Sequence, residues 1–333
     1  MQKVTVLGAG AWGSTLAQVL TDAGNEVLLW ARNSAVVSEI NTSHTNQKYL
    51  GEHVLPETLR ATSDLDEAFA FSSIYVLAIP SSQLRETVTI WKDRFSADCT
   101  IVSTLKGIEV STQLRMTEVM EAILGKKKIA LITGPNLADE LILRQPAAAV
   151  AASTNRALAE EVRTLFKNPY YRVYTSVDLL GCEMAGAIKN VIALAVGISI
   201  GLGYGENTQA MLITRGLNEV ARLCAAHAAD PLSAMGLAGM GDLVATCGSP
   251  LSRNRSFGEL VGRTGSIETA RAENVKTVEG VASSGAIVEI AHRVGVEVPV
   301  IEAVADIVNG SLTPTQAMTR LMEITTLSEN FIR

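Results

Sequence analysis

Cysteine and histidine are both scarce in this sequence, with 4 of each among 333 residues. The cysteines show neither the paired spacing of zinc sites nor a disulfide framework, and the isolated histidines are interpreted as surface or packing residues. The residues are Cys99, Cys182, Cys224 and Cys247, and His44, His53, His227 and His292. Their scarcity and scatter predict a metal-free protein of a reducing compartment.

Excess positive charge is also missing. The formal net charge is −6, whereas nucleic-acid binders are normally basic. The dense basic run, Lys126 to Lys128, is short and is interpreted as a solvated turn before a strand. We therefore predict no nucleic-acid partner.

Long apolar runs are missing as well. The stretch from Val191 to Gly203 has only about 13 residues, short of the roughly 20 that span a bilayer. The chain opens directly into "KVTVLGAG", without the pattern of a signal peptide. We predict a cytoplasmic protein that does not insert into membranes.

What the sequence does contain is a globular composition, with 47% hydrophobic and 19% charged residues. A chain of 333 residues is too long for one ordinary core, so we expect two domains.

Short β-rich runs alternate with helical segments in the first half of the chain. Several runs are apolar almost throughout, which is typical of a parallel sheet covered by helices in a doubly wound α/β fold. The runs are 3–8, 26–31, 73–79, 100–105, 128–133 and 147–153, with 171–176 as a further edge or antiparallel strand.

After Ser176 the pattern changes to Ala-, Leu- and Gly-rich segments at helical spacing. Prolines divide this part into successive helices. These are Pro231, Pro250, Pro299 and Pro314. We predict a Rossmann domain over 1–177 and an all-α substrate domain over 178–333.

The run "GAGAWG" at residues 8–13 matches G-x-G-x-x-G between a strand and a helix. Gly8 permits a tight turn, Gly10 lets a pyrophosphate approach the backbone, and Gly13 allows close helix–strand packing. The helix start adds unpaired amides and partial positive charge. This context predicts a dinucleotide-binding site.

The end of the second strand indicates which dinucleotide is bound. An acidic residue there would bind the ribose 2′-hydroxyl of NAD, but the chain has Arg32 instead. An arginine suits a 2′-phosphate, so NADPH is favoured over NADH, which stays possible. The alternative is that Arg32 is only a solvated loop residue.

Two loops at the expected carboxyl edge of the sheet contain candidate substrate-binding residues. Lys106 lies in "STLKGIE", and Gly134 and Asn136 lie in "TGPNLADE". In such folds the substrate sits at this edge, here between the two domains. From spacing alone, Lys106 could equally be an exposed loop lysine.

Lys189 lies within the apolar run "GCEMAGAIKNVIALAVGISIGLG", although lysine is almost never buried unpaired. It either extends its amine to water or lines a cleft. Asp242, amid small apolar residues, could be its structural partner, and Thr246 would share the helix face of Asp242.

The run "SRNRSFG" places hydroxyl, guanidinium and amide groups where a helix begins after Pro250. Together with free backbone N–H groups, such residues suit a phosphate dianion. The alternative is an ordinary capped helix start.

These motifs, in this order, resemble the NAD(P)-dependent glycerol-3-phosphate dehydrogenases of the bacterial type. The resemblance runs from residue 3 to about 320 and includes "GAGAWG", "LKGIE", "GPNLADE", "GAIKNVIALAVG", "GMGDLVATC", "SRNRSFG" and "TVEG". It implies reversible reduction of dihydroxyacetone phosphate to sn-glycerol 3-phosphate, a precursor for glycerophospholipid synthesis.

The resemblance also implies roles for individual residues. Lys189 would be the proton acceptor for the C2 hydroxyl, or its donor in reduction, and an apolar setting that disfavours the charged amine suits this task. Substrate contacts would come from Lys106, Gly134, Asn136, Asp242, Ser252, Arg253 and Asn254, with Asp242 and Thr246 orienting the amine. Cofactor contacts would come from Ala11, Trp12, Arg32, Lys106, Ala138, Arg253, Thr277 and Glu279. Asn136 stands where bacterial members commonly have serine, which leaves its hydrogen bond open.

Two other functions stay open from the residues. One is a related two-domain reductase acting on a hydroxy or keto acid, although "SRNRSFG" fits phosphate better than carboxylate. The other is a non-catalytic NADPH-sensing regulator, which would not need Lys189, Lys106 and Asp242 together. The helical domain also offers apolar surface for a homodimer.

Overall fold

The computed structural model describes residues 1–273 and 278–323, so Thr277 lies outside the described residues. The chain divides into two compact units. The N-terminal unit comprises Met1–Lys106 and Met116–Leu179, and the C-terminal unit comprises Gly107–Arg115 and Leu180–Arg333. The sequence predicted one break after residue 177. The segment 107–115, directly after Lys106, instead packs with the C-terminal unit.

An eight-stranded sheet forms the centre of the N-terminal unit, with the order β3-β2-β1-β4-β5-β6-β7-β8. The strands are β1 (Lys3–Leu7), β2 (Glu26–Trp30), β3 (Arg60–Thr62), β4 (Ile74–Leu77), β5 (Thr100–Ser103), β6 (Lys128–Thr133), β7 (Ala147–Ala152) and β8 (Tyr171–Ser176). Neighbours from β3 to β6 are parallel, β7 runs antiparallel to β6, and β8 pairs parallel with β7 at the edge. The predicted doubly wound fold and the edge strand at 171–176 are confirmed.

Two details of the sheet differ from the prediction. The sequence did not predict β3, which has only 3 residues at the outer edge of the sheet. It also gave no signal that β7 reverses direction. The reason is that alanine-rich β7 is nearly as apolar as its parallel neighbours, and apolarity reports burial rather than strand direction.

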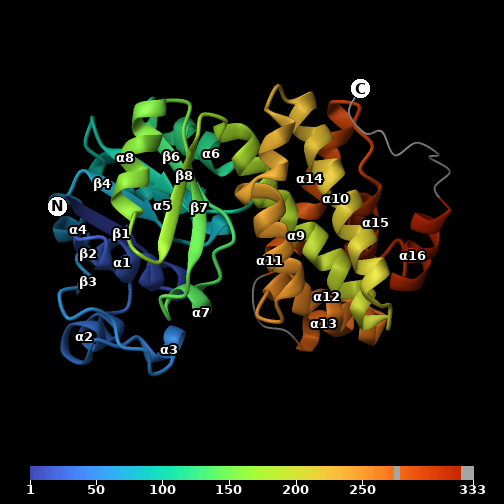
Figure 1. The fold of residues 1–333 in the computed structure, drawn as a ribbon, viewed down its shortest axis with the longest axis horizontal. Helices are drawn as coiled ribbons and strands as arrows, with labels where there is room; N and C mark the ends of the chain where they lie inside the picture. The colour runs from blue at the N-terminus through green and yellow to red at the C-terminus, as the bar shows by residue number, and fades with distance from the viewer. Residues whose placement is uncertain (274–277, 324–333) are drawn as a thin grey trace. The chain divides into compact units, whose positions relative to one another are not determined.

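Helices connect the strands of this unit (Figure 1). They are α1 (Ala11–Asp22), α2 (Ser34–Ser43), α3 (Gln47–Leu50), α4 (Leu65–Phe71), η1 (Ser81–Gln83), α5 (Leu84–Trp91), η2 (Lys92–Arg94), α6 (Met116–Leu124), α7 (Ala138–Leu141) and α8 (Arg156–Phe166). Asn33, Asp64 and Asn155 each accept backbone N–H bonds as N-caps, which fixes where α2, α4 and α8 begin.

The described part of the C-terminal unit contains helices and no strand, as the sequence predicted (Figure 1). They are α9 (Leu179–Gly201), α10 (Glu206–Ala226), η3 (Pro231–Met235), η4 (Leu237–Gly241), α11 (Asp242–Gly248), α12 (Arg253–Thr264), α13 (Ile267–Glu273), α14 (Glu279–Arg293), α15 (Pro299–Val308) and α16 (Pro314–Met322). Pro231, Pro299 and Pro314 stand in the first turns of η3, α15 and α16. Proline is tolerated there because the first N–H groups of a helix have no partner within it.

Helix α9 is the core helix of the C-terminal unit. It has 23 residues and is long and apolar enough to cross a membrane, but 89% of its apolar window is buried within the protein. The apolar stretch 191–203 covers only the second part of this helix. The helix begins earlier and includes Glu183 and Lys189, both buried. Burial against other helices, rather than lipid, explains its composition.

Four glycines bring α9 and α12 unusually close. A Cβ at Gly197 or Gly201 would lie 2.0 or 2.1 Å from the carbonyl oxygens of Arg255 and Glu259. A Cβ at Gly258 or Gly262 would likewise meet backbone oxygens of α9 at 2.3 and 2.2 Å. Only glycine fits at these positions, so α12 is held along most of its length against the C-terminal part of α9.

Candidate active site

The glycine loop between β1 and α1 has the geometry of an anion site. Gly8 has φ +118°, and a Cβ there would lie 2.5 Å from the carbonyl oxygen of Ala78. A Cβ at Gly13 would lie 1.8 Å from the carbonyl oxygen of Gly8, whereas one at Gly10 would meet nothing within 4 Å. Gly8 and Gly13 therefore serve close packing, and Gly10 leaves the backbone open to a ligand.

The helix that follows this loop begins without a competing side chain. Gly10 is the N-cap of α1, no side chain caps the helix, and its first turn, which includes Ala11 and Trp12, has no acidic residue. Its first N–H groups and the positive end of the helix dipole therefore favour an anion. The loop fits a dinucleotide pyrophosphate.

Arg32 lies two residues beyond Trp30, whose carbonyl oxygen accepts a 3.1 Å hydrogen bond from the backbone N–H of Gly8. Its side chain is exposed and has no hydrogen-bond or ionic partner among the described residues. The neighbouring Asn33 is engaged, because its Oδ1 accepts from the N–H of Ala35 as the cap of α2. A charge at the end of β2 is thus available to a ribose substituent.

The loops that follow β5 and β6 are joined by a hydrogen bond. Lys106, just beyond β5, donates from Nζ to the carbonyl oxygen of Gly134 at 3.1 Å. The Oδ1 of Asn136 accepts from the hydroxyl of Tyr171 at 3.2 Å, and its Nδ2 is buried with no hydrogen-bond partner among the described residues. Ala138 begins α7. Lys106, Gly134 and Asn136 therefore lie at one edge of the sheet.

In the C-terminal unit, Lys189 is the centre of a buried polar cluster. It is only 7% exposed, and its Nζ donates to Oδ1 of Asp242 and to Oγ1 of Thr246, each at 2.6 Å. Asp242 and Thr246 are 2% and 5% exposed. They share one face of α11, and the threonine hydroxyl also donates to Oδ1 of Asp242 at 3.3 Å. The structure thus brings together the three residues that the sequence grouped.

Cys247 borders this cluster as a neutral group. Burial raises the pKa of its thiol to about 12, although the charge of Lys189 opposes the shift. The thiol is therefore protonated at neutral pH and is not a candidate nucleophile.

Asn190 joins two predicted site residues and was missed by sequence reasoning. Its Nδ2 donates to Oε2 of Glu279 at 3.2 Å, and its Oδ1 accepts from Nδ2 of Asn254 at 3.1 Å. The Oδ1 of Asn254 in turn accepts from the N–H of Gly280 at 2.9 Å. These bonds connect α9, α12 and α14. The only signal in the sequence was that Asn190 follows Lys189.

Ser252 and Arg253 begin α12 with different surroundings. Ser252 is buried, and its Oγ accepts the N–H of Arg255 at 3.3 Å as the helix cap. Arg253 is exposed and, among the described residues, has no partner for its guanidinium. Arg255, two residues later, pairs with Glu259 at 3.2 Å. The beginning of α12 is therefore capped by Ser252, and the guanidinium of Arg253 is still available to a ligand.

Two family models match the chain. One, described as the NAD-dependent glycerol-3-phosphate dehydrogenase N-terminus, matches residues 3–159, and the other, its C-terminus, matches residues 178–319. The chain belongs to the NAD-dependent glycerol-3-phosphate dehydrogenase family.

Curated relatives and solved structures of glycerol-3-phosphate dehydrogenases agree. The glycerol-3-phosphate dehydrogenase [NAD(P)+] of Corynebacterium glutamicum (strain R) is 50% identical over 325 residues, which cover 97% of this chain and 98% of that protein. The crystal structure of glycerol-3-phosphate dehydrogenase from Coxiella burnetii has a TM-score of 0.90 at 35% identity, covering 97% of this chain and 99% of that one. A ketopantoate reductase from Ralstonia eutropha has a TM-score of 0.62 at 16% identity over 95% of this chain and 99% of that one, which shows a shared fold alone.

Proposed function

We propose that this chain catalyses the reversible NAD(P)H-dependent reduction of dihydroxyacetone phosphate to sn-glycerol 3-phosphate. Membership of the glycerol-3-phosphate dehydrogenase family supports the reaction class. The observation that carries the proposal is the buried ammonium of Lys189, held by Asp242 and Thr246 at 2.6 Å each. A regulator that only senses a dinucleotide would not need this group.

Lys189 is proposed to move the proton. In the reducing direction its Nζ gives a proton to the C2 oxygen of the substrate, and in the oxidising direction the neutral amine accepts it. When bound, the nicotinamide supplies or accepts the hydride. Asp242 and Thr246 hold Nζ in place, and the carboxylate of Asp242 stabilises the ammonium when it is charged. Their burial keeps water from competing for these bonds.

The phosphate of the substrate is proposed to bind at the beginning of α12. The exposed guanidinium of Arg253 supplies charge, and the first-turn amides supply directed donors. Both polar atoms of the Asn254 side chain have partners in the protein, so this residue is proposed to act mainly by fixing the turn. Lys106, Gly134 and Asn136 are proposed to contact the same substrate.

The dinucleotide is proposed to bind along the glycine loop, with NADPH preferred. The proposed pyrophosphate site is formed by Gly8, Gly10, Ala11, Trp12 and Gly13. Arg32 selects the 2′-phosphate. Further contacts to the dinucleotide are proposed for Lys106, Ala138, Arg253, Thr277 and Glu279. The described side chain of Glu279 accepts from Asn190, which fixes its orientation.

The proposal is tested by following NAD(P)H absorbance with a panel of carbonyl compounds. We expect turnover with dihydroxyacetone phosphate, and much less with unphosphorylated dihydroxyacetone or with keto acids such as ketopantoate. Turnover of the keto acid alone would assign the chain to a different reductase. Cofactor binding without any turnover would favour a dinucleotide sensor.

A further inference from the structure

Asn46 is a fully buried polar residue that contacts the glycine loop. It is 0% exposed and lies directly before α3, in the connection between α2 and β3. Its Nδ2 donates to the carbonyl oxygen of Ala9 at 3.0 Å and to Oγ of Ser14 at 2.9 Å. Both acceptors belong to the loop and first turns of α1. No motif in the sequence identifies this residue.

The bond to Ala9 determines the direction of the next amide. A trans peptide is planar, so its carbonyl and its N–H point to opposite sides. Because Asn46 holds the carbonyl of Ala9, the N–H of Gly10 points away from Asn46. A carbonyl that rotated into the site would repel an anion, so this contact keeps the dipole of the Ala9–Gly10 peptide in the favourable sense.

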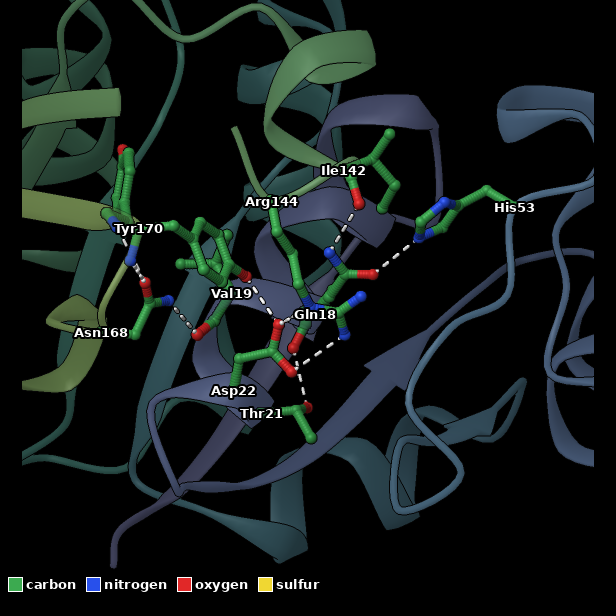
Figure 2. Close-up of polar contacts among 11 residues, drawn as sticks. Gln18, Val19, Thr21, Asp22, His53, Ile142, Arg144, Asn168 and Tyr170 are labelled. Carbon is green, nitrogen blue, oxygen red and sulfur yellow. Dashed lines mark hydrogen bonds and ion pairs between the residues drawn. The ribbon is translucent and has the colours of Figure 1, made fainter. Parts of the chain in front are cut away.

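The segment that contains Asn46 has a second attachment to α1. The side chain of His53 shares a 2.9 Å hydrogen bond with Oε1 of Gln18, and Nε2 of Gln18 donates to the carbonyl oxygen of Ile142 at 2.9 Å. Figure 2 shows the Gln18 amide between His53 and Ile142. An isolated bridge between Thr45 and Val54 closes the segment. Asn46 is therefore held by its own bonds and by the fold of the segment around it.

Toward the described residues, the side-chain amide of Asn46 acts only as a hydrogen-bond donor, through Nδ2. Its Oδ1 is buried and has no hydrogen-bond partner among the described residues. Burying an unpaired carbonyl oxygen is costly, so the arrangement persists because the two bonds from Nδ2 offset that cost.

We propose that Asn46 is a positioning residue of the dinucleotide site, which turns the Ala9–Gly10 peptide so that the Gly10 amide faces the pyrophosphate. The inference rests on the proposed function only through the dinucleotide site. It does not depend on which carbonyl compound is reduced.

The test is direct binding of NADPH and NADH, measured by calorimetry or by quenching of protein fluorescence. Asn46→Ala should raise the Kd of both cofactors about tenfold, as expected for a lost backbone contact to a charged group. At saturating cofactor, kcat should change less than about threefold, because the proton-transfer residues are untouched. Asn46→Asp should bind more weakly still, since a carboxylate would face the carbonyl of Ala9.

Two matched variants separate positioning from general stability. Ser14→Ala removes the other acceptor of Nδ2 and keeps the bond to Ala9, and His53→Ala removes the second attachment of the segment. Both should keep Kd within about threefold of wild type, whatever their thermal midpoints. If Asn46→Ala does not fold, Asn46→Ser, with a shorter donor, should give an intermediate Kd.

The outcomes are distinguishable. An unchanged Kd in the folded Asn46 variants, or an equal rise in Ser14→Ala and His53→Ala, would overturn the inference while leaving the proposed function intact. Failure of the wild-type protein to bind either cofactor would overturn both. Binding without turnover of dihydroxyacetone phosphate would overturn the proposed reaction alone.

Discussion

The hydroxyl of Tyr171, at the beginning of the edge strand β8, donates a 3.2 Å hydrogen bond to Oδ1 of Asn136 in the loop after β6. Tyr171 is fully buried, so its ring fixes where this hydroxyl lies. With Oδ1 engaged, Asn136 presents its buried Nδ2 as a donor. We therefore propose that Asn136, whose hydrogen bond the sequence left open, donates to the substrate from its amide nitrogen.

Tyr171→Phe should raise the KM for dihydroxyacetone phosphate about two- to tenfold and lower kcat less. The ring packing stays, but a hydrogen bond of about 0.5 to 1.5 kcal/mol that orients the amide is lost. In an Asn136→Ser background the same change should have little effect, because a serine hydroxyl does not depend on Tyr171. Steady-state kinetics of the four proteins checks this. An equal loss in both backgrounds would mean that Tyr171 acts on the fold.

Lys189→Ala should lower kcat about 10² to 10⁴-fold, the usual cost of removing a general acid–base group. Lys189→Arg should be nearly as poor, because a guanidinium does not deprotonate at working pH. Single-turnover and steady-state rates measure the loss, and NADPH binding should persist. Near-normal kcat in either variant would remove Lys189 from the mechanism.

Stability provides a control for this experiment. Lys189→Ala leaves the buried carboxylate of Asp242 without its ion-pair partner, which costs about 3 to 5 kcal/mol of unfolding free energy. Adding Asp242→Asn should recover part of that loss in denaturant unfolding without recovering activity. Recovery of activity in the double variant would show that the single variant was merely unstable.

Gly258→Ala should destabilise the C-terminal unit. Its Cβ would lie 2.3 Å from the carbonyl oxygen of Leu194, so the backbones of α9 and α12 must separate. Overpacking of this kind costs about 1 to 3 kcal/mol. Gly285→Ala is the matched control: its Cβ would meet nothing within 4 Å, and helix propensity should add about 0.5 to 1 kcal/mol. Urea unfolding compares the two, and equal effects would contradict the contact.

The sequence predicted features that obey a repeated pattern or a physical necessity. The glycine loop follows the G-x-G-x-x-G spacing, and a buried lysine such as Lys189 requires a partner, for which Asp242 amid small residues was a candidate. The edge strand β3 was not predicted because three residues are too few to show the alternation of a strand. The roles of Asn46 and Tyr171 could not be predicted because both act through contacts to residues distant in the chain, and such pairs have no local pattern.

The sequence does not separate the two uses of a side chain that can serve both the fold and a substrate. The contact of Ser252 with a phosphate stays a prediction, and the structure shows that its Oγ also caps α12. The contact of Asn254 with a phosphate likewise stays a prediction, and its side-chain amide forms hydrogen bonds with Asn190 and Gly280. The sequence predicts that Ser252 and Asn254 lie at a helix start. Only the tertiary contacts of their side chains determine which polar atoms stay available to a substrate.

Arg253→Ala should raise the KM for dihydroxyacetone phosphate strongly, because a charge-assisted contact to a dianion is lost. The variant should also discriminate less between dihydroxyacetone phosphate and dihydroxyacetone. Arg255→Ala is the control, since that guanidinium already pairs with Glu259. Measuring kcat/KM for both substrates decides the point, and an unchanged ratio in Arg253→Ala would place the phosphate elsewhere.

Arg32 should determine the cofactor preference. It is exposed at the end of β2, and the neighbouring Asn33 is occupied as a helix cap, so discrimination rests on the guanidinium. An exposed arginine–phosphate pair is worth less than a buried one. We therefore expect NADPH to be preferred over NADH about ten- to a hundredfold, or about 1.4 to 2.8 kcal/mol.

Substitutions at this position should change the preference in a graded way. Arg32→Ala should abolish it, and Arg32→Asp should reverse it, because a carboxylate repels the 2′-phosphate and accepts from the free ribose hydroxyl. Added salt should weaken the wild-type preference, since screening acts on a solvated pair. Measuring kcat/KM for both cofactors in the three proteins tests this. The same preference in all three would show that Arg32 is a solvated loop residue with no part in selecting the dinucleotide.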